Sequence, residues 1–208
     1  MINILYKVLG MVGTNVYFPY NEETRECVII DPADQADAII RLIREKDLKP
    51  VRILLTHGHF DHFMAMDAVR DHFGIPVYAL DLEEQTLSDP DKNGTRGFLG
   101  RGMTVKADGF MRDGEKLELL GTEWQVIATP GHTEGSCCFY IPSEKILFAG
   151  DTLFCGSYGR CDLPGGSEAA IVRSIRGKLF TLPEDTKVLC GHMGPTTIGT
   201  EKKYNPLA

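Results

Sequence analysis

The stretch His57-Gly58-His59-Phe60-Asp61-His62 decides the fold, because it places four metal-ligand residues within six positions. It directly follows Val51–Thr56, an apolar and partly β-branched run that is typical of a buried strand. A strand ending in histidines at i and i+2, followed by an Asp-His pair, directs several side chains into one cavity. Imidazole nitrogens and carboxylate oxygens suit divalent ions such as zinc, manganese or iron. Because such ions activate water, the stretch indicates hydrolytic chemistry.

Three further apolar runs also end in a candidate ligand. They are Ile127–His132, Ile146–Asp151 and Val188–His192. Functional sites in α/β layer folds usually lie outside strand ends, so we expect these side chains to converge. Glycines beside His132, Asp151 and His192 allow the backbone to turn sharply near a metal.

The complete set contains five histidines and two aspartates: His57, His59, His62, His132, His192, Asp61 and Asp151. Seven ligands exceed the needs of one tetrahedral zinc but fit two ions that share a carboxylate. We expect Asp151 to be the shared ligand. Each residue alone has a plainer interpretation as a satisfied polar group, and His72, near a predicted helix C-terminus, is assigned that role.

The order of predicted elements indicates an α/β fold in one domain, residues 1–208. Strands alternate with helices in the first eighty residues, and a second half rich in strands follows. Helices are predicted at Asp34–Asp47 with Asp34 as N-cap, at His62–Phe73 ended by Gly74, and at Ser167–Phe180 with Ser167 as N-cap. The segment Leu87–Gly114 has little periodicity and is predicted to be a functional loop.

Composition narrows the possible partners. The formal net charge of -7 argues against a nucleic-acid backbone as the main partner. No run approaches the roughly 18 apolar residues that span a membrane. The six cysteines form no Cys-x-x-Cys pair, and the first residues lack the pattern of a signal peptide. We therefore expect a cytoplasmic protein, either a monomer or a small homo-oligomer.

Four motifs resemble, in order, those of the metallo-β-lactamase-fold hydrolases. They are Thr56–His62, Pro130–Ser136, Phe148–Thr152 and Gly191–Pro195. The resemblance implies a four-layer αββα sandwich. It also implies that His57, His59 and His132 hold one metal, that Asp61, His62 and His192 hold a second, and that Asp151 lies between them.

Within that family, Gly156–Gly166 and Thr196–Pro206 are similar to short glyoxalase II-like (hydroxyacylglutathione hydrolase-like) thioesterases. This resemblance implies hydrolysis of S-lactoylglutathione or a related acyl thioester by a hydroxide held between two ions. Zinc is the first expectation, with iron or manganese as alternatives. Asp61 and Asp151 are the predicted catalytic residues. Full-length glyoxalase II has a further C-terminal helical domain that binds glutathione. Since this chain stops at Ala208, soon after His192, we expect a single domain without that addition, and glutathione recognition does not carry over from the resemblance.

The sequence offers two candidate substrate-binding features and three alternative functions. Arg160 is a candidate for an anionic substrate, although a structural pairing with Asp162 is favoured, and Leu87–Gly114 is a candidate substrate wall. The runner-up function is a persulfide dioxygenase, which uses one iron held by two histidines and an aspartate. A phosphodiesterase or ribonuclease of the same fold is third, and a non-catalytic binding protein is fourth.

Overall fold

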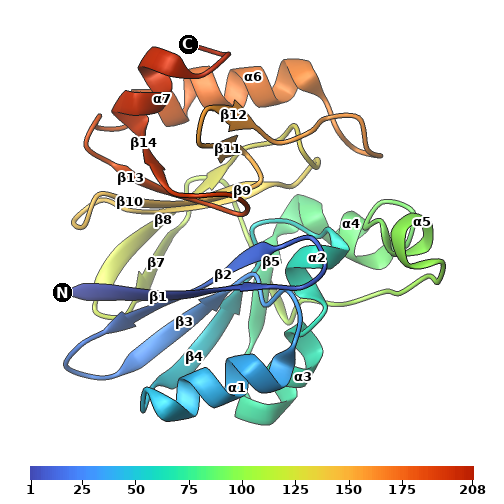
Figure 1. The fold of residues 1–208 in the computed structure, drawn as a ribbon, viewed down its shortest axis with the longest axis vertical. Coiled ribbons are helices and arrows are strands. Elements are labelled where there is room, and N and C mark those ends of the chain that lie inside the picture. The colour runs from blue at the N-terminus through green and yellow to red at the C-terminus, as the bar shows by residue number, and fades with distance from the viewer.

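The computed structural model describes residues 1–208 and contains two six-stranded sheets packed face to face (Figure 1). In the first sheet, β1, β2 and β3 are antiparallel neighbours, whereas β3 to β6 run parallel. Its strands are β1 (Ile2–Leu9), β2 (Thr14–Asn21), β3 (Glu26–Ile30), β4 (Lys49–Leu54), β5 (Val77–Leu80) and β6 (Gly109–Met111).

The second sheet is antiparallel except where β10 and β13 run parallel. Its strands, in spatial order, are β14 (Thr196–Thr197), β13 (Lys187–Cys190), β10 (Ile146–Gly150), β9 (Cys137–Ile141), β8 (Thr122–Ala128) and β7 (Lys116–Leu119). A separate small hairpin is formed by β11 (Leu153–Phe154) and β12 (Ser157–Tyr158).

Helices cover the outer faces of both sheets (Figure 1). Below the first sheet lie α1 (Ala36–Glu45) and α3 (Met66–Phe73), and above the second lie α6 (Glu168–Gly177) and α7 (Ile198–Tyr204). The remaining helices are short: α2 (Phe60–Phe63), α4 (Glu84–Ser88), α5 (Thr95–Leu99) and the 3-10 turns Asp81–Glu83 and Leu179–Thr181. The predicted αββα sandwich is confirmed. None of the helices combines the length and apolar character needed to cross a membrane.

Apolar side chains fill the three interfaces between these four layers. Between the sheets, Trp124 stacks on Phe148 with ring centroids 5.7 Å apart. The alternation of side chains along β9 sends Cys137 into this middle layer and Cys138 into the layer under α6, where Ile171 is buried. The sandwich therefore has a core on each side of both sheets, and burial of these side chains is its main stabilising contribution.

Two local predictions were wrong. Helix α1 begins at Ala36, after Gln35 in a left-handed conformation, and Asp34 makes no cap to the helix because its Oδ1 accepts from the Gln35 N–H at 2.6 Å. The single helix predicted for residues 62–73 is two helices, α2 and α3. They separate where the Ala65 N–H donates to the carbonyl of Pro32, a contact between segments distant in sequence.

The other helix predictions were closer to the structure. Ser167 caps α6 by accepting from the Ala170 N–H, as predicted, and Gly74 ends α3 with a φ of 64°. The segment Leu87–Gly114 is mostly irregular, but it also contains the short helix α5 and the edge strand β6.

Candidate metal centre

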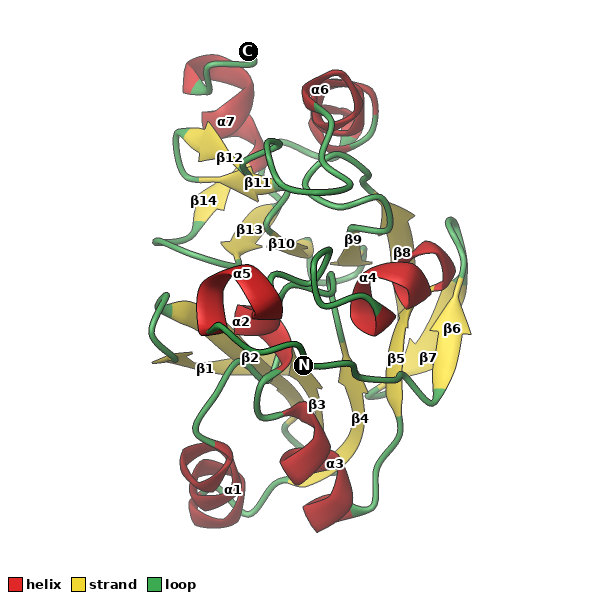
Figure 2. Cartoon of the chain, turned by 90° about the vertical axis from the view of Figure 1, so that its right-hand side faces the viewer, coloured by secondary structure: helices red, strands yellow, loops and turns green.

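All seven predicted ligands meet at one edge of the sandwich, between the two sheets. His57 and His59 follow the end of β4, and α2 carries Asp61 and His62 immediately afterwards. The other three follow β8, β10 and β13 in the second sheet: His132, Asp151 and His192. Figure 2 views this edge, where α2, α4 and α5 lie at the level between the sheets. The site is therefore assembled from both halves of the chain.

The side chains form two groups of three, each close enough to share one ion. Within each group, one ligand atom per residue lies within 4.8 Å of the others; the groups are His57, His59, His132 and Asp61, His62, His192. The Nδ1 of His59 lies 2.8 Å from the Nε2 of His132. In the second group, the Nε2 of His192 lies 3.2 Å from Asp61 Oδ2. The grouping is the one that the family resemblance implies.

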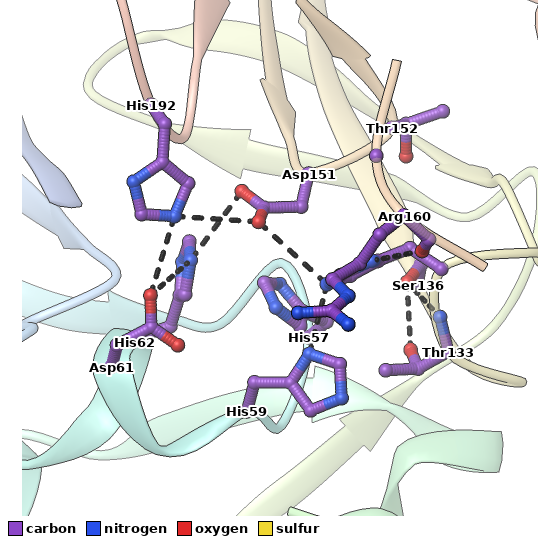
Figure 3. A network of polar contacts seen from close by, with 12 residues as sticks. His57, His59, Asp61, His62, Thr133, Ser136, Asp151, Thr152, Arg160 and His192 are labelled. Atoms are coloured by element: carbon purple, nitrogen blue, oxygen red, sulfur yellow. Dashed lines mark hydrogen bonds and ion pairs between the residues drawn. The ribbon is translucent and has the colours of Figure 1, made fainter. Parts of the chain in front are cut away.

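Asp151 lies between the two groups (Figure 3). Its Oδ1 is 3.4 Å from the Nε2 of His62. Its Oδ2 is 3.6 Å from the Nε2 of His132 and 3.3 Å from that of His192. The carboxylate therefore contacts both groups, the position required of a ligand that serves two ions.

Unsatisfied buried atoms show that this cluster fits metal ions. His57 Nε2, His62 Nε2 and Asp151 Oδ1 are buried and have no hydrogen-bond partner. Each such atom would cost about 1–3 kcal/mol if nothing bound to it. Neutral imidazole and carboxylate donors are the types that zinc, iron and manganese accept in proteins. The donor set is therefore suited to divalent cations.

In two histidines of the cluster, His62 and His132, the ring nitrogen Nδ1 contacts an oxygen of the protein. The Nδ1 of His62 lies 2.9 Å from Asp31 Oδ2, and the Nδ1 of His132 lies 2.7 Å from the carbonyl oxygen of Arg160. Metal-binding histidines commonly donate their second N–H in this way, which fixes the ring orientation. Both rings therefore turn Nε2 toward the cluster.

Asp31 also lies close enough to His57 and His62 to be considered a ligand. However, its Oδ1 accepts from the Thr56 N–H at 2.7 Å, and its Oδ2 accepts from the Thr56 hydroxyl at 2.6 Å as well as facing His62. Because both oxygens are occupied, we interpret Asp31 as an orienting residue and not as a ligand.

The charges in the cluster favour a cation. Burial alone would raise the pKa of Asp61 and Asp151, but His62 and His192 hold both pKa values below the usual range. Burial would lower the pKa of the two histidines, yet the surrounding carboxylates raise it to about 9 for His62 and about 10 for His192. The carboxylates are therefore ionised, and a bound ion would displace the histidine protons.

Close backbone approach around Asp151 explains two glycines. A Cβ atom at Gly191 would overlap Asp151 Oδ1, and one at Gly159 would overlap the Asp151 carbonyl oxygen. From the first half of the chain, the Tyr17 hydroxyl donates to the Cys190 carbonyl at 2.7 Å, and Asn15 Nδ2 donates to the same oxygen at 3.0 Å. These contacts hold the segment before His192 against β2.

Three supporting residues were not identified from the sequence: Thr14, Asp31 and Glu83. Thr14 Oγ1 donates to Asp61 Oδ2 at 3.0 Å, and the buried Glu83 accepts from the Gly58 N–H at 2.7 Å. The sequence could have indicated Asp31, because it directly follows the apolar run Cys27–Ile30, just as the predicted ligands follow apolar runs. No sequence pattern could have identified Thr14 or Glu83, since their roles depend on tertiary contacts.

A cavity of about 370 Å³ opens beside the cluster. Gly94 and Phe98 line it, so part of the segment predicted as a substrate wall does border the site. Arg160 also lines it, but its guanidinium makes two 2.7 Å bonds to Asp162, the pairing that the sequence favoured. A contact between Arg160 and substrate stays a prediction.

Comparisons with known proteins agree with this geometry. The family model described as the Metallo-beta-lactamase superfamily matches residues 9–192. The chain is 39% identical over 199 residues to the probable metallo-hydrolase YqgX of Bacillus subtilis, covering 95% of this chain and 93% of that one. It is 35% identical over 187 residues to the hydroxyacylglutathione hydrolase GloC of Haemophilus influenzae, covering 89% and 88% of the two chains.

Solved structures are also similar over nearly the full length. The BLEG-1 B3 metallo-beta-lactamase superimposes with a TM-score of 0.93 at 43% identity, covering 98% of each chain. TTHA1623, solved in a di-iron-bound form, gives a TM-score of 0.86 at 33% identity and covers 98% of this chain and all of that one. ETHE1 from Myxococcus xanthus gives a TM-score of 0.80 at 28% identity, covering 99% of this chain and 83% of that one.

Proposed function

Because the chain belongs to the metallo-beta-lactamase superfamily and is a metal-dependent hydrolase, we propose that it cleaves acyl thioesters at a site for two divalent ions. The observation that carries the two-ion proposal is the Asp151 carboxylate, which contacts two complete groups of ligand atoms. The relative named hydroxyacylglutathione hydrolase supports a thioester as the substrate class. Zinc is the first candidate metal, and the di-iron form of a similar structure supports iron as an alternative.

In this proposal the seven clustered residues would hold the ions, which when bound would supply an acidified water molecule and polarisation of the substrate carbonyl. Hydrolysis adds the water oxygen to the acyl carbon and breaks the carbon–sulfur bond, releasing a carboxylate and a thiol. Asp61, fixed by Thr14, points one carboxylate oxygen toward the cluster, where it would orient the attacking water. Because a thiolate leaves readily, the reaction needs no proton donor from the protein.

The persulfide dioxygenase alternative is supported by the similarity to ETHE1, but it leaves part of the site unused. One iron held by two histidines and an aspartate would leave several of the seven clustered donors without a function. The buried Nε2 atoms of His57 and His62 both lack hydrogen-bond partners, which favours a ligand role for both. Two ions account for these atoms better than one.

The test combines metal quantification, on protein purified without chelators, with a thioester panel that includes S-lactoylglutathione and acyl-coenzyme A. We expect about two metal ions per chain and release of thiol from at least one thioester. Asp151→Ala should lower kcat/KM by at least about a hundredfold, since even partners of metal ligands contribute roughly 10–100-fold.

His72→Ala is the matched control, because His72 is exposed and its ring faces Arg44 away from the cluster. It should retain both metal and activity. One iron per chain with oxygen uptake on glutathione persulfide would overturn the proposal, as would unchanged activity in Asp151→Ala. Hydrolysis of a penicillin without any thioesterase activity would also contradict it.

A further inference from the structure

Two kinds of residue line the cavity beside the metal centre. Ligand residues border it, and so do six apolar residues, which we call the apolar wall: Val12, Phe60, Phe98, Phe154, Tyr158 and Leu163. Phe98 is 55% exposed and Val12 is 50% exposed, so both present apolar surface to solvent at the cavity mouth. Exposed apolar side chains gathered at a functional cavity commonly mark a binding surface.

The apolar wall is built by segments that are distant in sequence. Val12 lies in the turn between β1 and β2, Phe98 in α5, and Phe154 in the β11–β12 hairpin. The ring of Phe98 stacks on that of Phe60, with centroids 5.3 Å apart, and Phe60 directly precedes Asp61. This stack connects the exposed wall to the helix that carries the ligands.

The same cavity offers little to an anionic substrate. Arg160 is the one lysine or arginine among its lining residues, and Asp162 already binds the guanidinium through both carboxylate oxygens. A carrier such as glutathione, with two carboxylates, would have to displace Asp162 or leave its charges unpaired. The volume, about 370 Å³, also lies near the lower end of the roughly 300–1,000 Å³ of small-molecule sites.

Resting on the proposed thioesterase function, we infer that the preferred substrates are small thioesters with an apolar acyl group and no anionic carrier. The acyl chain packs against Phe98 and Phe154, and the thioester carbonyl lies at the ligand cluster. Specificity then comes from burial of apolar surface rather than from ion pairing.

The experiment measures kcat/KM of the metal-loaded protein for N-acetylcysteamine thioesters of acetyl, butyryl and hexanoyl groups. This carrier is small and uncharged. We expect kcat/KM to rise about three- to fourfold per added methylene until the cavity is filled, which corresponds to about 0.8 kcal/mol per buried methylene. Phe98→Ala should reduce the hexanoyl-to-acetyl ratio several-fold. Phe110→Ala, a partly exposed phenylalanine outside this cavity, should leave the ratio unchanged.

A second comparison tests the charge argument. Asp162→Asn removes the negative charge that pairs with Arg160 and one of its two acceptor oxygens, so the ratio of kcat/KM for S-lactoylglutathione to that for lactoyl-N-acetylcysteamine should rise several-fold. A flat dependence on acyl length in the wild type, or a wild-type preference for S-lactoylglutathione over the hexanoyl compound, would overturn this inference while leaving the thioesterase proposal intact. Hydrolysis of none of these compounds, nor of acyl-coenzyme A, would overturn both.

Discussion

At the scale of single residues, two buried carboxylates outside the ligand set hold the ligand loops in place. Asp31 fixes the ring of His62 and also binds the backbone of Thr56, one residue before His57. Glu83 accepts from the Gly58 N–H, between His57 and His59, and from the Thr133 hydroxyl at 3.1 Å. Each carboxylate therefore connects two segments of the site, and Glu83 connects segments from the two halves of the chain.

Glu83 should make stability depend on pH. Burial raises the pKa of its carboxyl from 4.5 to about 7, although its hydrogen bonds act in the opposite direction. Between these values the folded protein keeps a proton that the unfolded chain has lost. The Glu83 contribution to the free energy of unfolding should therefore fall by up to about 3 kcal/mol as the pH rises from 4.5 to 7.

Urea unfolding of metal-free wild type and Glu83→Gln at several pH values between 4.5 and 7.5 measures this contribution. The variant cannot ionise at this position, so its curve against pH should be flatter. Glu84→Gln is the control, because Glu84 is adjacent but exposed, and it should follow the wild type. Parallel curves for wild type and Glu83→Gln would refute the assignment.

At the scale of elements, two glycines near helix ends should respond oppositely to alanine. Gly74 ends α3 with a φ of 64°, a conformation that costs an L-residue about 1–2 kcal/mol, so Gly74→Ala should destabilise by about 1 kcal/mol. Gly177 is the last residue of α6, has no positive φ and has open space where a Cβ would lie. Gly177→Ala should stabilise by about 0.5 kcal/mol. Chemical denaturation of both variants checks the signs, and a shared sign would contradict this explanation.

The helices also show where sequence patterns succeed. Ser167 and Gly74 act where predicted, because a cap depends mainly on residues within one turn of the helix. Asp34 has the residue type of a cap, yet the left-handed Gln35 occupies the cap position before Ala36, without a side-chain hydrogen bond to the helix. The division between α2 and α3 depends on the hydrogen bond from the Ala65 N–H to the Pro32 carbonyl. A local sequence pattern cannot predict a contact between such distant segments.

At the scale of the whole molecule, the positions of the ligands could be predicted because each follows an apolar strand. Strand ends gather at one edge of a layered fold, so His132, Asp151 and His192 were expected near His57. The apolar wall could not be predicted in the same way. Val12, Phe98 and Phe154 lie in turns and short elements whose mutual positions are fixed only when the two sheets pack.

Because each half supplies part of the site, metal removal should weaken the whole sandwich. The first group joins His57 and His59 with His132, and the second joins Asp61 and His62 with His192. An ion that binds only the folded chain adds about 4 kcal/mol at a concentration a thousandfold above its dissociation constant. For a chain of this size, that free energy corresponds to a rise in Tm of roughly 8–16 °C.

Thermal unfolding with excess metal and with chelator measures this coupling. The single tryptophan, Trp124, lies between the sheets, so its fluorescence reports on their separation, while circular dichroism reports on all elements. With metal, both signals should change at one higher temperature, since the ions connect the halves. Asp151→Ala should lose most of the increase and His72→Ala should keep it. An equal Tm with and without chelator would mean that the seven residues bind no ion tightly enough to hold the two halves together.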